Sequence, residues 1–222
     1  MLLPTCSRIP AFGSGQRTVQ AKILNSITIF SQNLTLPLRN FLVLLGILVS
    51  CNQVDTTYFP DPYQYPIEDK FFSGKVEFQK LTSTQGFKLL LKDSADNTID
   101  QTIFKYVPYQ FDTADVNRDG RTEILIGLIK STEFDPQEKK RLFILRIDNG
   151  QLRPLWLGSK VCQELIDFRS LDNGIVQTIE RTPSDKYAIG DYYWESFGLT
   201  LRNYTHNEIS LHEALQIFRH AN

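Results

Sequence analysis

Hydrophobic and polar residues alternate in short runs along the chain from Lys75 onward. Runs of four to ten residues, bounded by glycine, proline, asparagine and aspartate, predict β-strands joined by turns. The predicted strands cover residues 75–81, 86–92, 102–107, 109–113, 122–130, 140–147, 151–157, 163–168, 174–181, 186–194 and 197–204. This many short strands at such spacing predict an all-β fold, built as a mostly antiparallel meander.

Two tight turns are predicted from asparagine–glycine pairs. Residues 148–150 (Asp-Asn-Gly) separate the strands 140–147 and 151–157, and Asp172-Asn173-Gly174 is a second sequence of the same kind. Asparagine and glycine tolerate the positive φ values that a tight hairpin requires. Both sites are therefore expected to reverse the chain.

The last predicted element is a helix that starts near Ser210. Ser210 and Glu213 have the spacing of a capping box. Four apolar residues fall on one helical face, namely Leu211, Ala214, Leu215 and Phe218. We expect this helix to cover an edge or an end of the sheet, which would otherwise be open to pairing.

The N-terminal part differs in composition from the rest. Residues 1–54 contain no Asp or Glu, whereas residues 51–222 carry all 25 acidic and 20 of the 24 basic side chains, a net charge of −5. Arg39 precedes an unbroken apolar run at 41–50. A bilayer-spanning helix needs about 20 residues, so this shorter run is typical of a secretory signal.

Leu48-Val49-Ser50-Cys51 resembles the lipobox of bacterial lipoproteins. The resemblance implies removal of residues 1–50, a lipid on Cys51, and a membrane anchor in the bacterial cell envelope. Residues 51–72 are rich in proline and are predicted to be a tether, with one β-rich domain over 73–222. Whether the inner or the outer membrane holds the protein stays open.

Nearly forty residues precede Arg39, which is long for a lipoprotein signal. Met1 is the only methionine, and a non-ATG start at Leu34 or Leu36 would give a compact signal. Residues 1–33 are therefore predicted to lie upstream of the true start. A second interpretation is a mitochondrial-type transit peptide, because the segment lacks acidic residues and has scattered Arg and Ser.

The charge and the cysteines restrict the classes of function. Mild acidity and the lack of a basic stripe argue against a nucleic-acid partner. The three cysteines are Cys6, Cys51 and Cys162. After cleavage and lipidation only Cys162 is left, so no intrachain disulfide is expected, and Cys162 is interpreted as a small core residue.

The motif with the clearest chemistry is the segment 115–123. Asp115, Asn117 and Asp119 place oxygen side chains at alternate positions, Gly120 permits a sharp turn, and Glu123 adds a carboxylate. Such a loop can wrap a hard cation such as calcium. The alternative is a metal-free turn in which Asp and Asn side chains bond their own backbone.

Residues 109–129 resemble an FG-GAP or VCBS repeat, the calcium-loop blade of integrin-like β-propellers. The resemblance implies a non-catalytic binding or adhesion scaffold, with an unidentified protein or glycan as partner. It also implies a calcium ion held by the side chains of Asp115, Asn117, Asp119 and Glu123 and by the backbone carbonyl of Arg121. The chain departs from the family pattern in having Glu at 123, and Arg118 and Arg121 bring positive charge to the loop, which opposes a metal.

Other stretches suggest that this blade is repeated. Residues 167–180 echo the motif with its ligands lost, and residues 141–156 and 191–205 each look like the outer hairpin of a blade. Two or three units are too few for a closed propeller, which typically has at least four. We therefore expect partial, propeller-like blades in an open stack.

No motif for catalysis is found. The histidines His206, His212 and His220 lie far from any nucleophile and are interpreted as solvated. The aromatic residues 192–197, with Trp156, are interpreted either as a sugar-stacking platform or as core and cross-strand pairs. The main hypothesis is a non-enzymatic envelope lipoprotein stiffened by a calcium-type loop. The alternative is an extracytoplasmic enzyme that acts on envelope polysaccharide through a pair of carboxylates.

Overall fold

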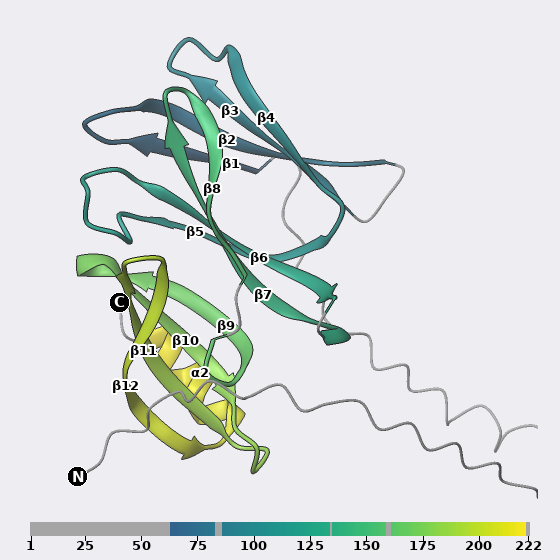
Figure 1. Ribbon diagram of the computed structural model, residues 1–222, viewed down its shortest axis with the longest axis vertical. Helices are drawn as coiled ribbons and strands as arrows, with labels where there is room; N and C mark the ends of the chain where they lie inside the picture. Colours follow the sequence, from purple (N-terminus) through teal and green to yellow (C-terminus); the bar gives the residue numbers. More distant parts are fainter. Residues whose placement is uncertain (1–62, 83–85, 134, 159–160, 221–222) are drawn as a thin grey trace, which may run out of the picture. The chain divides into compact units, whose positions relative to one another are not determined.

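A computed structural model describes residues 63–82, 86–133, 135–158 and 161–220. The predicted signal at 1–50, Cys51 and residues 52–62 lie outside the described residues. The described residues form three antiparallel sheets of four strands each and the helix α2 (Figure 1). No helix in the described ranges is long and apolar enough to cross a membrane.

Each sheet is a meander whose strands pair in the order of the sequence. The first sheet contains β1 (Tyr63–Glu68), β2 (Ser73–Lys80), β3 (Phe87–Asp93) and β4 (Thr98–Phe104). The second contains β5 (Val107–Ala114), β6 (Glu123–Thr132), β7 (Asp135–Asp148) and β8 (Gln151–Leu157). The third contains β9 (Glu164–Leu171), β10 (Ile175–Arg181), β11 (Tyr187–Glu195) and β12 (Gly198–Ile209), and α2 (Leu211–His220) follows it. The predicted fold class, antiparallel β with partial blades and one C-terminal helix, is confirmed.

The second sheet is buried on both faces. On β6, Ile124 and Ile126 point into a core shared with the first sheet (the first core), whereas Leu125 points into a core shared with the third sheet (the second core). All three side chains are fully buried. A strand covered on both faces needs apolar residues at consecutive positions, which explains why the sequence of β6 reads as a continuous hydrophobic run.

The two predicted asparagine–glycine turns are confirmed. Asn149 and Gly150 have φ values of 52° and 74° and connect β7 to β8. Asn173 and Gly174, at 69° and 68°, lie in a short 3-10 turn (Asp172–Gly174) between β9 and β10. Both turns use the left-handed backbone region that asparagine and glycine tolerate.

Residues 63–68, predicted to belong to the tether, instead form the strand β1 of the first sheet. Tyr63, Tyr65 and Ile67 pack on the first core, and the rings of Tyr63 and Tyr65 meet Phe111 edge-on at centroid distances of 5.9 and 5.5 Å. Pro66 is compatible with a strand here because β1 is an edge strand, where proline is tolerated.

Helix α2 packs on a face of the third sheet, and the prediction that it covers an edge or an end is wrong in this detail. Ala214 is fully buried against Ile179 and Ile189. These two isoleucines lie on the face of the third sheet that points away from the second core, and the helix covers them there. The N–H of Glu213 donates to Ser210 Oγ at 3.2 Å, as in a capping box. Leu211 is 38% exposed and contributes little to this contact.

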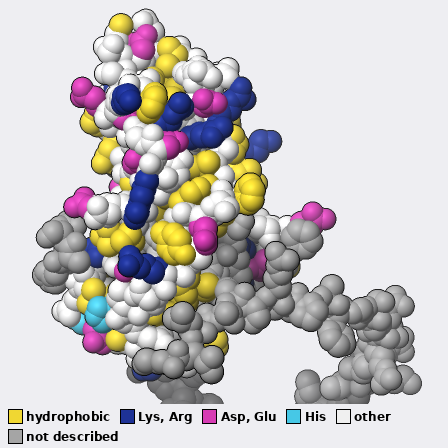
Figure 2. Space-filling view, turned by 60° about the vertical axis from the view of Figure 1, so that its left-hand side comes forward, with side chains coloured by type: hydrophobic (Ala, Val, Ile, Leu, Met, Phe, Trp, Pro, Cys, Tyr) yellow, Lys and Arg dark blue, Asp and Glu magenta, His cyan; other side chains and the backbone are white. Residues whose placement is uncertain are grey.

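The face of the first sheet opposite its core carries charged side chains that form ion pairs with one another. Lys92 Nζ lies 2.7 Å from Glu77 Oε2, and Lys75 Nζ lies 2.7 Å from Asp96 Oδ1. The hydrogen bond from Lys92 lowers the pKa of Glu77 although burial opposes it. Figure 2 shows basic and acidic side chains interspersed on the surface that it draws.

Candidate metal-binding loop

The loop between β5 and β6 wraps around the carboxylate of Asp115. Asp115 Oδ1 accepts the N–H of Asp119 at 3.0 Å, and Oδ2 accepts the N–H of Gly120 at 2.9 Å. Asp119 Oδ1 in turn accepts the N–H of Arg121 at 2.9 Å. Gly120 has φ +84°, so the sharp turn predicted from this glycine is present.

Asn117 completes this turn. Asn117 Oδ1 accepts the N–H of Asp119 at 3.1 Å, while its amide donates to Asp119 Oδ2 at 3.1 Å. Side chain to backbone bonds of this kind are the ones expected of a metal-free Asx turn. The oxygens of Asp115 and Asp119 therefore have hydrogen-bond partners within the loop in this conformation.

Glu123 is the exception, because one of its oxygens has no partner. The residue is fully buried. Its Oε2 accepts the N–H of Val116 at 2.9 Å, but Oε1 is buried and has no hydrogen-bond partner among the described residues. Burial, reinforced by the nearby Asp119 and Asp115, raises the pKa of Glu123 to about 7, although the backbone N–H groups of Val116 and Asn117 act in the opposite direction. A buried carboxylate oxygen without a donor is destabilising, and a proton, a cation or a water molecule can satisfy it.

The two arginines of the loop are engaged with its neighbours. Arg118 Nε donates to the carbonyl of Asn173 at 2.9 Å. The Arg121 guanidinium lies over the ring of Phe71 at 4.3 Å and lies 3.4 Å from Asp148. From the sequence, the positive charges of Arg118 and Arg121 are expected to oppose the binding of a metal ion in this loop. In the structure, each of the two side chains contacts a residue outside the loop.

The loop consequently contacts both neighbouring sheets. On the first sheet, the N–H of Thr122 donates to Asp69 Oδ2 at 2.7 Å. Asp69 Oδ1 accepts the N–H groups of Phe71 and Phe72. Burial alone would raise the pKa of Asp69, yet these three bonds lower it. Asp69 was not anticipated from the sequence, because it lies in the segment predicted to be the tether.

On the third sheet, Gly174 makes a contact in addition to the one between Arg118 and Asn173. Gly174 is buried, and a Cβ atom placed on it would lie 2.7 Å from the carbonyl oxygen of Asp115 and 3.0 Å from that of Val116. The turn that contains Gly174 connects β9 to β10, the first two strands of the third sheet, just as the loop connects β5 to β6, the first two strands of the second sheet. The stretch that echoes the acidic motif therefore occupies the equivalent place in the next sheet.

The oxygens that could hold a cation are those of the predicted ligand set, Asp115, Asn117, Asp119 and Glu123 with the Arg121 carbonyl. Carboxylate, amide and carbonyl oxygens are the ligands that a hard cation prefers. No three His, Cys, Asp or Glu side chains in the described ranges converge as a ready metal site. Binding would thus require Asp115 and Asp119 to turn oxygens away from the backbone N–H groups that they now accept.

The other candidates from the sequence are not brought together. His206 and His212 are exposed, and the side chain of His220 is not described. The aromatic residues divide between core and surface: Tyr192 and Trp156 are buried in the second core, whereas Phe197 is 94% exposed. Of the two interpretations of these aromatic residues, the division between core and surface is the one that the structure favours.

Glu180 is a buried carboxylate that the sequence pattern did not reveal. It is fully buried and accepts from the hydroxyls of Thr178 and Tyr192 at 2.7 Å each, from the N–H of Gln163 at 2.7 Å, and from the Tyr204 hydroxyl at 3.2 Å. The Tyr192 hydroxyl also accepts the N–H of Cys162. Both oxygens of Glu180 have donors, so this cluster braces the third sheet.

Comparison with known proteins does not identify the chain. No protein-family model matches it, and neither the curated proteins nor the solved structures yield a match.

Proposed function

We propose that the protein is a membrane-anchored lipoprotein of the bacterial envelope, whose non-catalytic β-domain is stiffened by a calcium ion in the 115–123 loop. The observation that carries the calcium part is the fully buried Glu123, whose Oε1 lacks a donor among the described residues and lies beside two further carboxylates. Since the loop contacts both neighbouring sheets, a cation there would stabilise the packing of all three. The domain then presents a rigid surface to a protein or glycan.

Calorimetric titration with calcium tests this proposal. We expect one calcium per chain, with the affinity reduced about tenfold or more by Asp115→Asn, which removes one ligand charge. Asp172→Asn is the matched control, because Asp172 is an exposed aspartate in the equivalent turn of the third sheet. An absence of binding heat, or an equal loss in both variants, would disprove the calcium site.

The anchor is tested separately by labelling cells with radioactive palmitate. Wild-type protein should incorporate label, and Cys51→Ala should not, because the thioether forms on the Cys51 sulfur. Cys162→Ala is the control and should keep the label. Label retained in the Cys51 variant would exclude a lipid at that position.

A further inference from the structure

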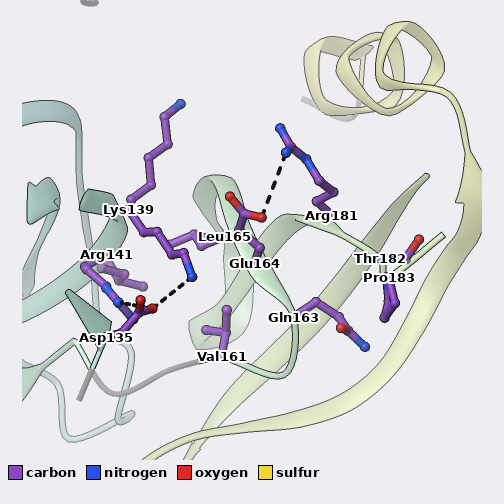
Figure 3. A pocket seen from close by; sticks show the side chains of 12 residues that line it. Asp135, Lys139, Arg141, Val161, Gln163, Glu164, Leu165, Arg181, Thr182 and Pro183 are labelled. Carbon is purple, nitrogen blue, oxygen red and sulfur yellow. Dashed lines mark hydrogen bonds and ion pairs between the residues drawn. The ribbon is translucent and has the colours of Figure 1, made fainter. Parts of the chain in front are cut away.

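A polar pocket lies where the second sheet meets the third. β7 forms one wall, and residues 161–165 with the start of the β10–β11 turn form the other (Figure 3). Its volume is about 250 Å³. Small-molecule sites typically span about 300–1,000 Å³, so this pocket has room for a single compact group or for the end of a longer ligand.

Positive charge predominates in this pocket. Its lining includes four cationic and only two acidic side chains, although the chain as a whole has a net charge of −1. The cations are Lys139, Lys140, Arg141 and Arg181, and the acids are Asp135 and Glu164. The lining itself therefore carries a positive excess, which favours anions, although Asp185 and Asp167 lie just outside it, next to Arg181 and Lys140 respectively.

On the β7 wall, two cations share one carboxylate. Lys139 Nζ and Arg141 Nη2 each lie 2.9 Å from Asp135 Oδ2. Arg141 is 9% exposed, and its Nε is buried without a hydrogen-bond partner among the described residues. One carboxylate cannot neutralise two cations, so this wall keeps a positive excess.

On the opposite wall, Arg181 is held only loosely. Its Nη1 lies 4.0 Å from Glu164 Oε2, its Nε lies 3.8 Å from Asp185 Oδ1, and its side chain is 42% exposed. Figure 3 shows Arg181 and Glu164 facing each other across from the pair formed by Lys139 and Asp135. Exposed ion pairs at this separation contribute little, so the Arg181 guanidinium can turn toward a stronger anionic partner.

We propose that this pocket binds an anionic group, a carboxylate or a phosphate, between Lys139 on β7 and Arg181 at the end of β10. The planar guanidinium of Arg181 matches the two oxygens of either group, and the Lys139 ammonium adds a compact charge. Lys140 is not a ligand, because its amine donates to the carbonyl of Ile166 at 2.8 Å and lies over the Tyr109 ring. The site is independent of the calcium-type loop.

Calorimetric titrations of the purified protein with inorganic phosphate and with D-glucuronate, at constant ionic strength, test the proposal. At least one probe should bind, and Arg181→Gln and Lys139→Gln should each weaken its binding about fivefold or more. Arg202→Gln, an exposed cation on β12, should leave the binding unchanged. Response to phosphate alone or to glucuronate alone would assign the chemical class of the ligand.

Two results would overturn the proposal. One is the absence of binding by both probes. The other is an equal loss in the Arg181 and Arg202 variants, which would indicate general attraction to the surface. Melting temperatures of the variants without ligand would show that each is folded, and both pocket side chains are sufficiently exposed for glutamine to be accommodated.

Discussion

Replacement of Glu123 by Gln should stabilise the calcium-free protein at neutral pH by about 2–3 kcal/mol. Burial raises the pKa of Glu123 from 4.5 to about 7, and each pKa unit corresponds to about 1.4 kcal/mol. The folded state therefore holds a proton that the unfolded state releases between these two values. Stability contributed by the protonated group is complete below about pH 4.5 and is lost as the pH rises toward 7.

Glutamine is neutral at every pH, can accept the Val116 N–H through its carbonyl, and can direct its amide toward the two aspartates. Urea unfolding of the wild type should show a free energy of unfolding that declines between pH 4.5 and 7. In Glu123→Gln this decline should be smaller by about 2–3 kcal/mol, and the remainder should come from other groups such as Asp167, whose pKa burial also raises. A variant less stable than the wild type at neutral pH would contradict the assignment of Glu123 Oε1 as an unsatisfied atom.

Gly174→Ala should destabilise the protein by about 3 kcal/mol. Two costs add: alanine at φ +68° is strained by about 1–2 kcal/mol, and its Cβ would meet backbone oxygens of Asp115 and Val116 at 2.7 and 3.0 Å. Backbone atoms cannot move aside as a flexible side chain can, so overpacking of this kind costs a further 1–3 kcal/mol, roughly.

Gly120→Ala is the matched control for this substitution. Gly120 has φ +84°, but a Cβ atom placed on it would have Phe71 Cε2 as its nearest neighbour at 3.8 Å, an ordinary contact. This variant should lose only the backbone term, about 1–2 kcal/mol. Equal losses in the two variants, measured by urea unfolding, would show that Gly174 does not hold the third sheet against the loop.

The strands of the second and third sheets were predictable because their residue patterns agree with their packing. The consecutive apolar residues of β6 indicate a strand without revealing that it separates two cores. β1 was missed because Pro66 and its neighbours look like a linker, and only the edge position makes a proline acceptable there. Local patterns do not specify which strand is at an edge.

The candidate ligands of the loop could be recognised from their spacing, but their partners could not. Asp69 accepts the N–H of Thr122, which lies 53 positions later in the sequence. Gly174 lies against the backbone of Asp115 only because the third sheet packs on the second. Glu180 stands at the end of a predicted strand, where a charged residue is usually exposed. Its burial depends on donors from Tyr192, Tyr204 and residue 163, which the fold brings together.

The pH dependence of calcium affinity tests most directly whether Glu123 is the buried ligand of a cation. Calcium would have to displace the proton that Glu123 holds below a pKa of about 7. The apparent affinity in calorimetric titrations should therefore rise about 25-fold from roughly pH 5.5 to roughly pH 7.5. Glu123→Gln should abolish this dependence. Equal calcium affinity at the two pH values in the wild type, or no binding at either, would contradict the proposed role of the loop.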